Sequence, residues 1–183
     1  LSYLLGFRQA QQIDLTGNSA AAHVLLMQLF EVGYILTYSI SLICPILIPR
    51  YSNSRLVEKK LYIFGGIASI ITMFINYAIS NKVFTIFSKN SDVIEIAKGV
   101  IPIASGLQFV SGLTCITEGI IQGYGMYNII GNGTVISMCL FFSFIRNIKT
   151  LPELWLLMCL STGLRGFVNN GLMKIQKYKE NED

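Results

Sequence analysis

Long uncharged runs, separated by short polar connections, dominate the pattern of hydrophobic and polar positions along this chain. A helix needs about 20 residues to cross the hydrocarbon core of a bilayer. Five runs reach or approach that length, and each holds at most one formal charge: Asn18–Pro49, Leu61–Ile79, Gly99–Gly123, Tyr127–Ile145 and Leu154–Met173. The runs lack the period-two alternation that is typical of barrel strands. The pattern therefore predicts an all-α polytopic membrane protein with about five transmembrane helices.

The same pattern sets the expected helix boundaries and one membrane unit over residues 1–173. The chain opens on Leu1–Gly6, which resembles the end of a helix already under way, so we expect a piece of a larger protein. Residues 174–183 are polar, and we expect this tail to extend into solvent. The predicted helices cover residues of about 1–15, 19–48, 57–80, 92–123, 127–146 and 152–173.

Composition supports a membrane protein and argues against several other classes. Only 13% of residues are charged, against about a quarter in soluble domains, and the mean hydropathy is +0.56. The net charge of +4 is scattered, which argues against nucleic acid as a partner. The four cysteines are widely spaced and match no metal pattern. Since no nucleophile–base arrangement is present either, we expect neither an enzyme nor a cofactor.

The most basic connection predicts the orientation in the membrane. The loop Arg50–Lys60 carries four cations, and loops rich in Lys and Arg remain on the cytoplasmic side. The tail from Lys174 then lies on the same side. The pattern indicates an integral, multi-pass protein in contact with membrane lipid, but it does not distinguish the plasma membrane from an organelle membrane.

Two of the predicted helices carry polar stripes that include a carboxylate. Glu31, Tyr34, Tyr38 and Ser41 fall at i, i+3, i+7 and i+10, which is one face of a helix. Ser111, Thr114, Glu118 and Gln122 form a second stripe. We expect the two stripes to line a shared cavity. A carboxylate there could bind a small organic substrate, or bind and release a coupling ion, H⁺ or Na⁺.

The charged residues also have structural interpretations. Glu118 could instead be paired with Arg165 or hydrogen-bonded between helices, and Glu31 is equally open to either role. We interpret Arg165 as a structural counter-charge, because a fixed cation would repel cationic cargo. His23 lies near a helix start, where a hydrogen-bonded structural residue is expected. The glycines predict close helix packing, through Gly119-xxx-Gly123 and the pairs Gly131/Gly133 and Gly163/Gly166.

Several short motifs, in order and spacing, resemble multidrug and toxic compound extrusion (MATE) transporters over nearly the whole chain. Ala20-Ala21-Ala22-His23, with Gln28 following, resembles the start of that family's eighth helix. Ile101-Pro102 together with the segment from Glu118 to Gly125 resembles the tenth helix. Leu164-Arg165-Gly166 resembles a motif of the twelfth. Pro49, followed by the basic segment Arg50–Arg55, fits the loop between helices eight and nine.

This resemblance implies a twelve-helix, two-lobe antiporter that exports organic cations, drugs or small metabolites in exchange for H⁺ or Na⁺. The chain would be most of the carboxy-terminal lobe, and the missing amino-terminal lobe would be its partner. Glu118 falls at the acidic position of helix ten that is implicated in cation coupling. The acidic residue of helix seven has no counterpart here, since Asp14 does not match it.

Two alternatives remain open at this point. One is a lipid-linked oligosaccharide flippase of the same superfamily, which would prefer several cations facing the cavity, where only Arg165 qualifies. The other is a non-transporting, half-length membrane relic that associates through its glycine faces.

Overall fold

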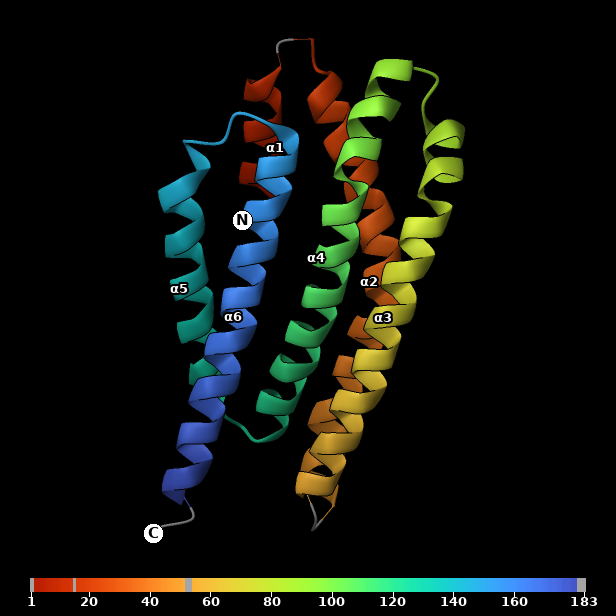
Figure 1. The fold of residues 1–183 in the computed structure, drawn as a ribbon. Coiled ribbons are helices and arrows are strands. Elements are labelled where there is room, and N and C mark those ends of the chain that lie inside the picture. Colours follow the sequence, from red (N-terminus) through yellow and green to blue (C-terminus); the bar gives the residue numbers. More distant parts are fainter. Residues whose placement is uncertain (1, 15, 52–53, 181–183) are drawn as a thin grey trace.

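The computed structural model describes residues 2–14, 16–51 and 54–180 of the chain. Within these ranges the regular secondary structure is helical, which confirms the predicted all-α class (Figure 1). In chain order the helices are α1 (Ser2–Ile13), α2 (Asn18–Arg50), α3 (Ser54–Phe87), α4 (Ser91–Gly123), α5 (Tyr127–Ile145) and α6 (Leu151–Glu180).

The third and fourth helices extend beyond the apolar runs that predicted them. α3 continues past the expected end near residue 80 to Phe87, and α4 begins at Ser91, so only residues 88–90 separate them. The turn is closed by Asn90, whose side-chain oxygen accepts a hydrogen bond from the Asp92 backbone amide at 3.0 Å. Such a cap satisfies one of the amides left open at a helix start. The helices end at this polar turn rather than where the apolar sequence ends.

Four helices, α2, α3, α4 and α5, are long and apolar enough to cross a bilayer, so the chain is an integral membrane protein. Five were expected. The fifth expected span lies in α6, where Arg165, Asn169 and Asn170 interrupt the apolar sequence and lower its hydropathy. α6 packs against both α4 and α5, so protein surrounds part of its surface.

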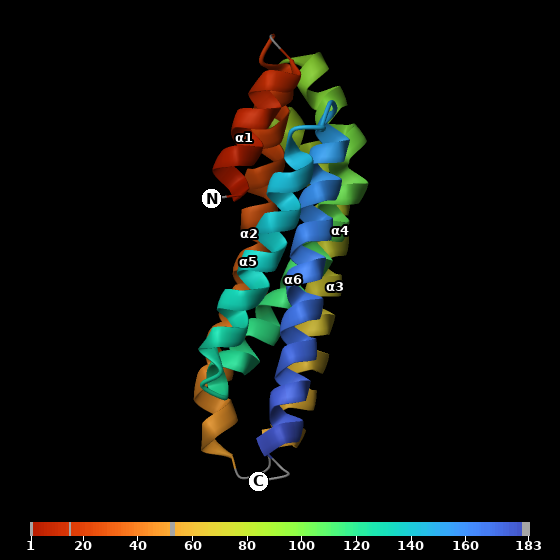
Figure 2. The same cartoon turned by 90° about the vertical axis from the view of Figure 1, so that its left-hand side faces the viewer.

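α4 is the centre of the bundle and packs against α2, α3 and α6 (Figures 1 and 2). Its contact with α2 depends on the predicted Gly119-xxx-Gly123 motif. A Cβ atom added to Gly119 would lie 2.5 Å from the Ser41 carbonyl oxygen, and one added to Gly123 would lie 2.7 Å from Ile48 Cβ. The predicted packing role of these two glycines is confirmed, because any larger side chain would separate the helices.

The other predicted packing glycines differ in their surroundings. A Cβ at Gly166 would lie 2.5 Å from Thr114 Oγ1, and one at Gly133 would overlap the Asn169 side chain. Gly163 has ordinary van der Waals space beside Val110. Gly131 faces open space, so no described neighbour requires a glycine there.

Two apolar clusters fill the bundle. One surrounds the fully buried Trp155 and Phe84 in the half that contains α1. The other surrounds Ile116 and Ile120 in the half where α2 ends and α3 begins. The end of α2, the start of α3, the turn between α4 and α5, and the end of α6 all lie at this second end (Figure 1). The cations of the expected loop Arg50–Lys60 lie instead in helices, because Arg50 ends α2 and Arg55, Lys59 and Lys60 belong to the first turns of α3. These cations and the basic last turns of α6 are therefore together, and we call this the basic end.

Candidate functional site

The Glu118 side chain on α4 forms an ion pair with Arg165 on α6. Arg165 Nε lies 2.9 Å from Glu118 Oε1, and the Asn169 side-chain amide donates to the same oxygen at 3.2 Å. The Glu118 side chain is 17% exposed and that of Arg165 is 31% exposed. Two α6 residues spaced i and i+4 therefore converge on one carboxylate oxygen, and the structural pairing considered for Glu118 is present.

The pair lies toward the basic end of the bundle. Glu118 comes five residues before Gly123, where α4 ends, and at 1.5 Å per residue this is about 7 Å along the helix axis. The rest of α4 extends to Ser91 on the far side of the pair. The carboxylate is therefore closer to one end of α4 than to its centre.

A small polar cavity lies beside Arg165, on the side away from the basic end. Its volume is about 80 Å³, enough for a few water molecules. It is lined by residues from three helices: Tyr34 of α2, Leu107 and Ser111 of α4, and Met158, Ser161, Thr162 and Arg165 of α6. Hydroxyl groups supply most of the polar lining, so the cavity is suited to waters that hydrate the guanidinium of Arg165.

Two of the predicted site residues contribute to this region through helix contacts. Thr114 Oγ1 donates to the Thr162 backbone carbonyl at 3.3 Å, next to the close approach of Gly166. The Tyr34 hydroxyl donates to Cys115 Sγ at 3.1 Å, and this thiol contacts the Ser41 hydroxyl at 3.1 Å. These bonds hold α2 and α6 against α4 around the cavity. The α4 stripe therefore faces α6 for most of its length.

The predicted meeting of Glu31 with Glu118 does not occur in the described chain. Glu31 and Tyr38 lie on the exposed face of α2, together with Gln28, and Tyr38 is 47% exposed. Tyr34 alone of this group turns inward to the cavity. The 3.6-residue period identified the stripe correctly, but its centre points outward because Gly33 and Thr37 occupy the packed face. The cavity beside Arg165 is lined by Tyr34 of the α2 stripe and Ser111 of the α4 stripe, but the two carboxylates, Glu31 and Glu118, do not share it.

Gln122 lies one turn beyond Glu118 on α4, in the direction of the basic end, and is half-buried. Its position keeps it on the same helix face as Glu118.

Sequence reasoning did not identify three buried amides that the structure places at helix contacts. Asn169 is fully buried and bonds to Glu118. Asn76 on α3 donates to the Gln108 side-chain oxygen on α4 at 3.3 Å, and Gln108 is also fully buried. Each amide lies within a long apolar run, where burial without a hydrogen-bond partner would be costly. Their positions in the sequence could therefore have predicted hydrogen bonds between helices.

His23 is buried at 2% exposure and accepts a hydrogen bond at Nδ1 from Trp155 Nε1, at 3.1 Å. His23 is therefore a hydrogen-bonded structural residue, as expected from its position near a helix start. Its neighbours Trp155 and Phe30 are aromatic, and no carboxylate among the described residues bonds to it.

Comparison with protein-family models, with curated proteins and with solved structures finds no match to this chain.

Proposed function

We propose that this chain is the carboxy-terminal lobe of a secondary active antiporter of the MATE type, with Glu118 as the residue that couples transport to H⁺ or Na⁺. The observation that carries the proposal is the Glu118–Arg165 ion pair, which joins two helices of a membrane bundle beside a polar cavity. Ionisable groups inside membrane segments are functional by default, because their insertion is costly. The family resemblance of the motifs around both residues supports the same reading.

The coupling would operate by competition for one carboxylate. In the ion-paired state Glu118 holds Arg165 and Asn169 and so fastens α6 to α4. A proton or a sodium ion bound to Glu118 removes the negative charge that Arg165 needs. Arg165 can then turn into the polar cavity, where hydroxyl groups and water replace the carboxylate. A cation that binds one of two conformations better shifts the balance toward that conformation.

The substrate would be a small organic molecule, bound where this lobe meets the amino-terminal lobe. Such transport requires one half of the structure to move against the other. The exposed polar face of α2, with Glu31 and Tyr38, is suited to contact with a second lobe or with cargo, because a charge left facing lipid would be unfavourable.

The second candidate is a non-transporting membrane protein, and one observation favours it. Arg165 and Asn169 together occupy a Glu118 oxygen, as they would in a fixed structural contact. In that case the pair serves only to hold α6 in place.

The test is gradient-driven efflux of a fluorescent organic cation from vesicles that contain the longest gene product. We expect Glu118→Gln to abolish the dependence on the H⁺ or Na⁺ gradient, whereas Glu95→Gln, a matched neutralisation at the exposed start of the same helix, retains it. Unchanged gradient-driven efflux by Glu118→Gln refutes the coupling role.

The double variant Glu118→Gln/Arg165→Gln separates coupling from packing, since it removes both charges and leaves none unpaired. We expect it to regain much of the stability that either single variant loses, because breaking one partner of a buried pair is the costly step. Its efflux should nevertheless stay uncoupled. Recovery of gradient-driven efflux together with stability would identify the pair as structural only.

A further inference from the structure

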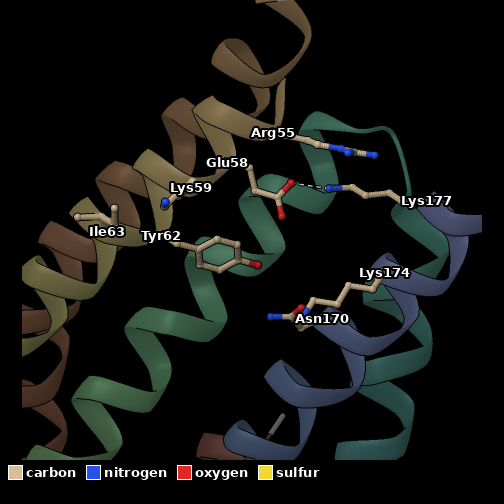
Figure 3. Close-up of a pocket in the computed structure, with 8 residues that line it drawn as sticks. All are labelled: Arg55, Glu58, Lys59, Tyr62, Ile63, Asn170, Lys174 and Lys177. Atoms are coloured by element: carbon tan, nitrogen blue, oxygen red, sulfur yellow. Dashed lines mark hydrogen bonds and ion pairs between the residues drawn. The ribbon is translucent and has the colours of Figure 1, made fainter. Parts of the chain in front are cut away.

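A basic groove lies between the first turns of α3 and the last turns of α6, separate from the Glu118 site. Its volume is about 630 Å³. Figure 3 shows Arg55, Glu58 and Tyr62 extending from α3 toward α6, and Lys174 and Lys177 extending from α6 toward α3. The residues that line it are Arg55, Glu58, Lys59, Tyr62 and Ile63 of α3, and Asn170, Lys174 and Lys177 of α6. Four cations against one carboxylate leave a net charge of +3 within the groove.

The single carboxylate of the groove is already engaged. Glu58 Oε2 accepts a hydrogen bond from Lys177 Nζ at 2.6 Å (Figure 3). It accepts another from the Tyr124 hydroxyl at 3.1 Å. Lys177 Nζ also lies 3.7 Å from the centre of the Tyr124 ring. These contacts fix one wall of the groove. Glu58 is therefore committed to Lys177 and does not neutralise the other three cations.

The remaining cations face the groove without a carboxylate of their own. Arg55, Lys59 and Lys174 form no ion pair with any residue in the ranges that the structure describes. The floor is polar as well. The Tyr62 hydroxyl donates to Thr117 Oγ1 at 3.4 Å, and Asn170 Oδ1 is buried without a hydrogen-bond partner. The three cations are suited to a multiply charged anion, whereas the Asn170 oxygen, itself an acceptor, contributes nothing to anion binding.

An apolar stripe leads away from the groove along α3. Ile63 lines the groove and is 51% exposed, and the stripe continues toward the centre of the bilayer through side chains at helical spacing. The exposed members of this stripe after Ile63 are Ile67, Ile70 and Phe74, at 50%, 43% and 62%. The acyl chain of a lipid can pack against this apolar stripe, whereas a soluble phosphate compound has no apolar part that would contact it.

We propose that the basic groove binds the headgroup of an anionic phospholipid with two or more negative charges, while an acyl chain lies along the Ile63–Phe74 stripe of α3. The headgroup phosphates take Arg55, Lys59 and Lys174 as partners. The groove opens at the basic end, which the distribution of Lys and Arg places on the cytoplasmic side. The cytoplasmic leaflet is the one that carries anionic lipids, and basic pockets between helices there suit such headgroups.

The test is native mass spectrometry of the full chain, purified in detergent and titrated with phosphatidylinositol bisphosphate. The variant Arg55→Gln/Lys174→Gln removes two groove cations and leaves the Glu58–Lys177 pair intact. Each lipid-facing cation contributes roughly fivefold to affinity, so we expect about twenty-five-fold weaker binding from the loss of two. Lys82→Gln/Lys89→Gln removes the same charge at the opposite end and should bind like the parent. The charge-preserving Arg55→Lys/Lys174→Arg should retain most of the binding, which shows that the neutral variant did not lose it by misfolding.

Two results would overturn the proposal. Equal loss of lipid from the Lys82→Gln/Lys89→Gln variant would mean that net charge alone attracts the lipid. Competition by water-soluble inositol trisphosphate at the same concentration as the lipid would identify a soluble phosphate site, in which the apolar stripe has no part. Both results are independent of Glu118, so they do not bear on the antiporter proposal.

Discussion

The Trp155 indole nitrogen donates a hydrogen bond to Nδ1 of His23 at 3.1 Å, which links α6 to the beginning of α2 across 132 residues of sequence. Both side chains are buried, at 0% and 2% exposure, and their rings meet edge to face with centroids 5.6 Å apart. The accepting nitrogen carries no proton, so the bond needs neutral histidine. This contact anchors α6 at the end of the bundle opposite the basic groove.

The first prediction concerns this bond. His23→Phe leaves the Trp155 N–H without a partner in the core, and Trp155→Phe leaves the His23 acceptor unpaired. We expect each single change to cost about 1–3 kcal/mol of unfolding free energy, and the double change to cost less than the sum. Denaturant unfolding in detergent measures all three. Strict additivity would show that the two side chains do not interact.

The second prediction concerns the approach of α2 to α4. Gly119→Ala would push a methyl group against the backbone of Ser41, which cannot move without separating the helices. We expect a loss of about 1–3 kcal/mol in thermal or denaturant unfolding. Gly131→Ala on α5 is the matched control, since open space surrounds that position, and there alanine should be neutral or slightly stabilising. Equal effects at the two glycines would contradict the packing role of Gly119.

The third prediction concerns pH at the start of α6. The Glu153 carboxylate accepts hydrogen bonds from the backbone amides of Lys149 at 2.9 Å and Thr150 at 3.2 Å. The Lys149 amide first, and then that of Thr150, lower the pKa of Glu153 below its ordinary value of 4.5. A carboxyl whose pKa is lowered on folding stabilises the fold fully above its unfolded pKa. That contribution is lost as the pH falls through the lower, folded pKa.

The first turn of α6 should therefore fray in acid, below the ordinary carboxyl range. A carboxyl-carbon NMR titration should give Glu153 a midpoint below 4.5, and the Lys149 and Thr150 amides should lose protection from hydrogen exchange over the same range. In Glu153→Ala the protection should already be low and should no longer change with pH. A Glu153 midpoint at or above 4.5 would contradict the capping role.

The sequence predicted the helices well because their signal is strong and local. Uncharged runs of about 20 residues identify helix positions, and the Gly119-xxx-Gly123 spacing identified a real contact. The ends of α3 and α6 were missed, because both helices continue past the apolar run that predicted them. The bounds of α4 were predicted to within one residue, and the polar cap Asn90 fixes its start. Capping depends on a few residues, whereas hydropathy is averaged over many.

The candidate site was predicted only in part, because a stripe on one helix does not determine what that stripe faces. The α4 stripe faces α6, where Arg165 meets Glu118, and this pairing was one of two readings that the residues allowed. The α2 stripe is divided, with Glu31 and Tyr38 exposed and with Tyr34 and Ser41 in contact with Cys115 of α4. Lipid, a cavity and a neighbouring helix each favour different side chains on the helix face beside them. A single sequence does not show which of the three lies beside a given face.

The polarity of α6 has a consequence for how the protein is made. A helix that carries Arg165, Asn169 and Asn170 enters hydrocarbon poorly by itself. Synthesis proceeds from the amino terminus, so α4 with Glu118 is already in the membrane when α6 emerges. The Glu118 carboxylate is then available to pair with Arg165, and α6 can insert against the surface of α4. Glu118→Gln should therefore lower the fraction of newly made chains whose last helix crosses the membrane, before any question of transport arises.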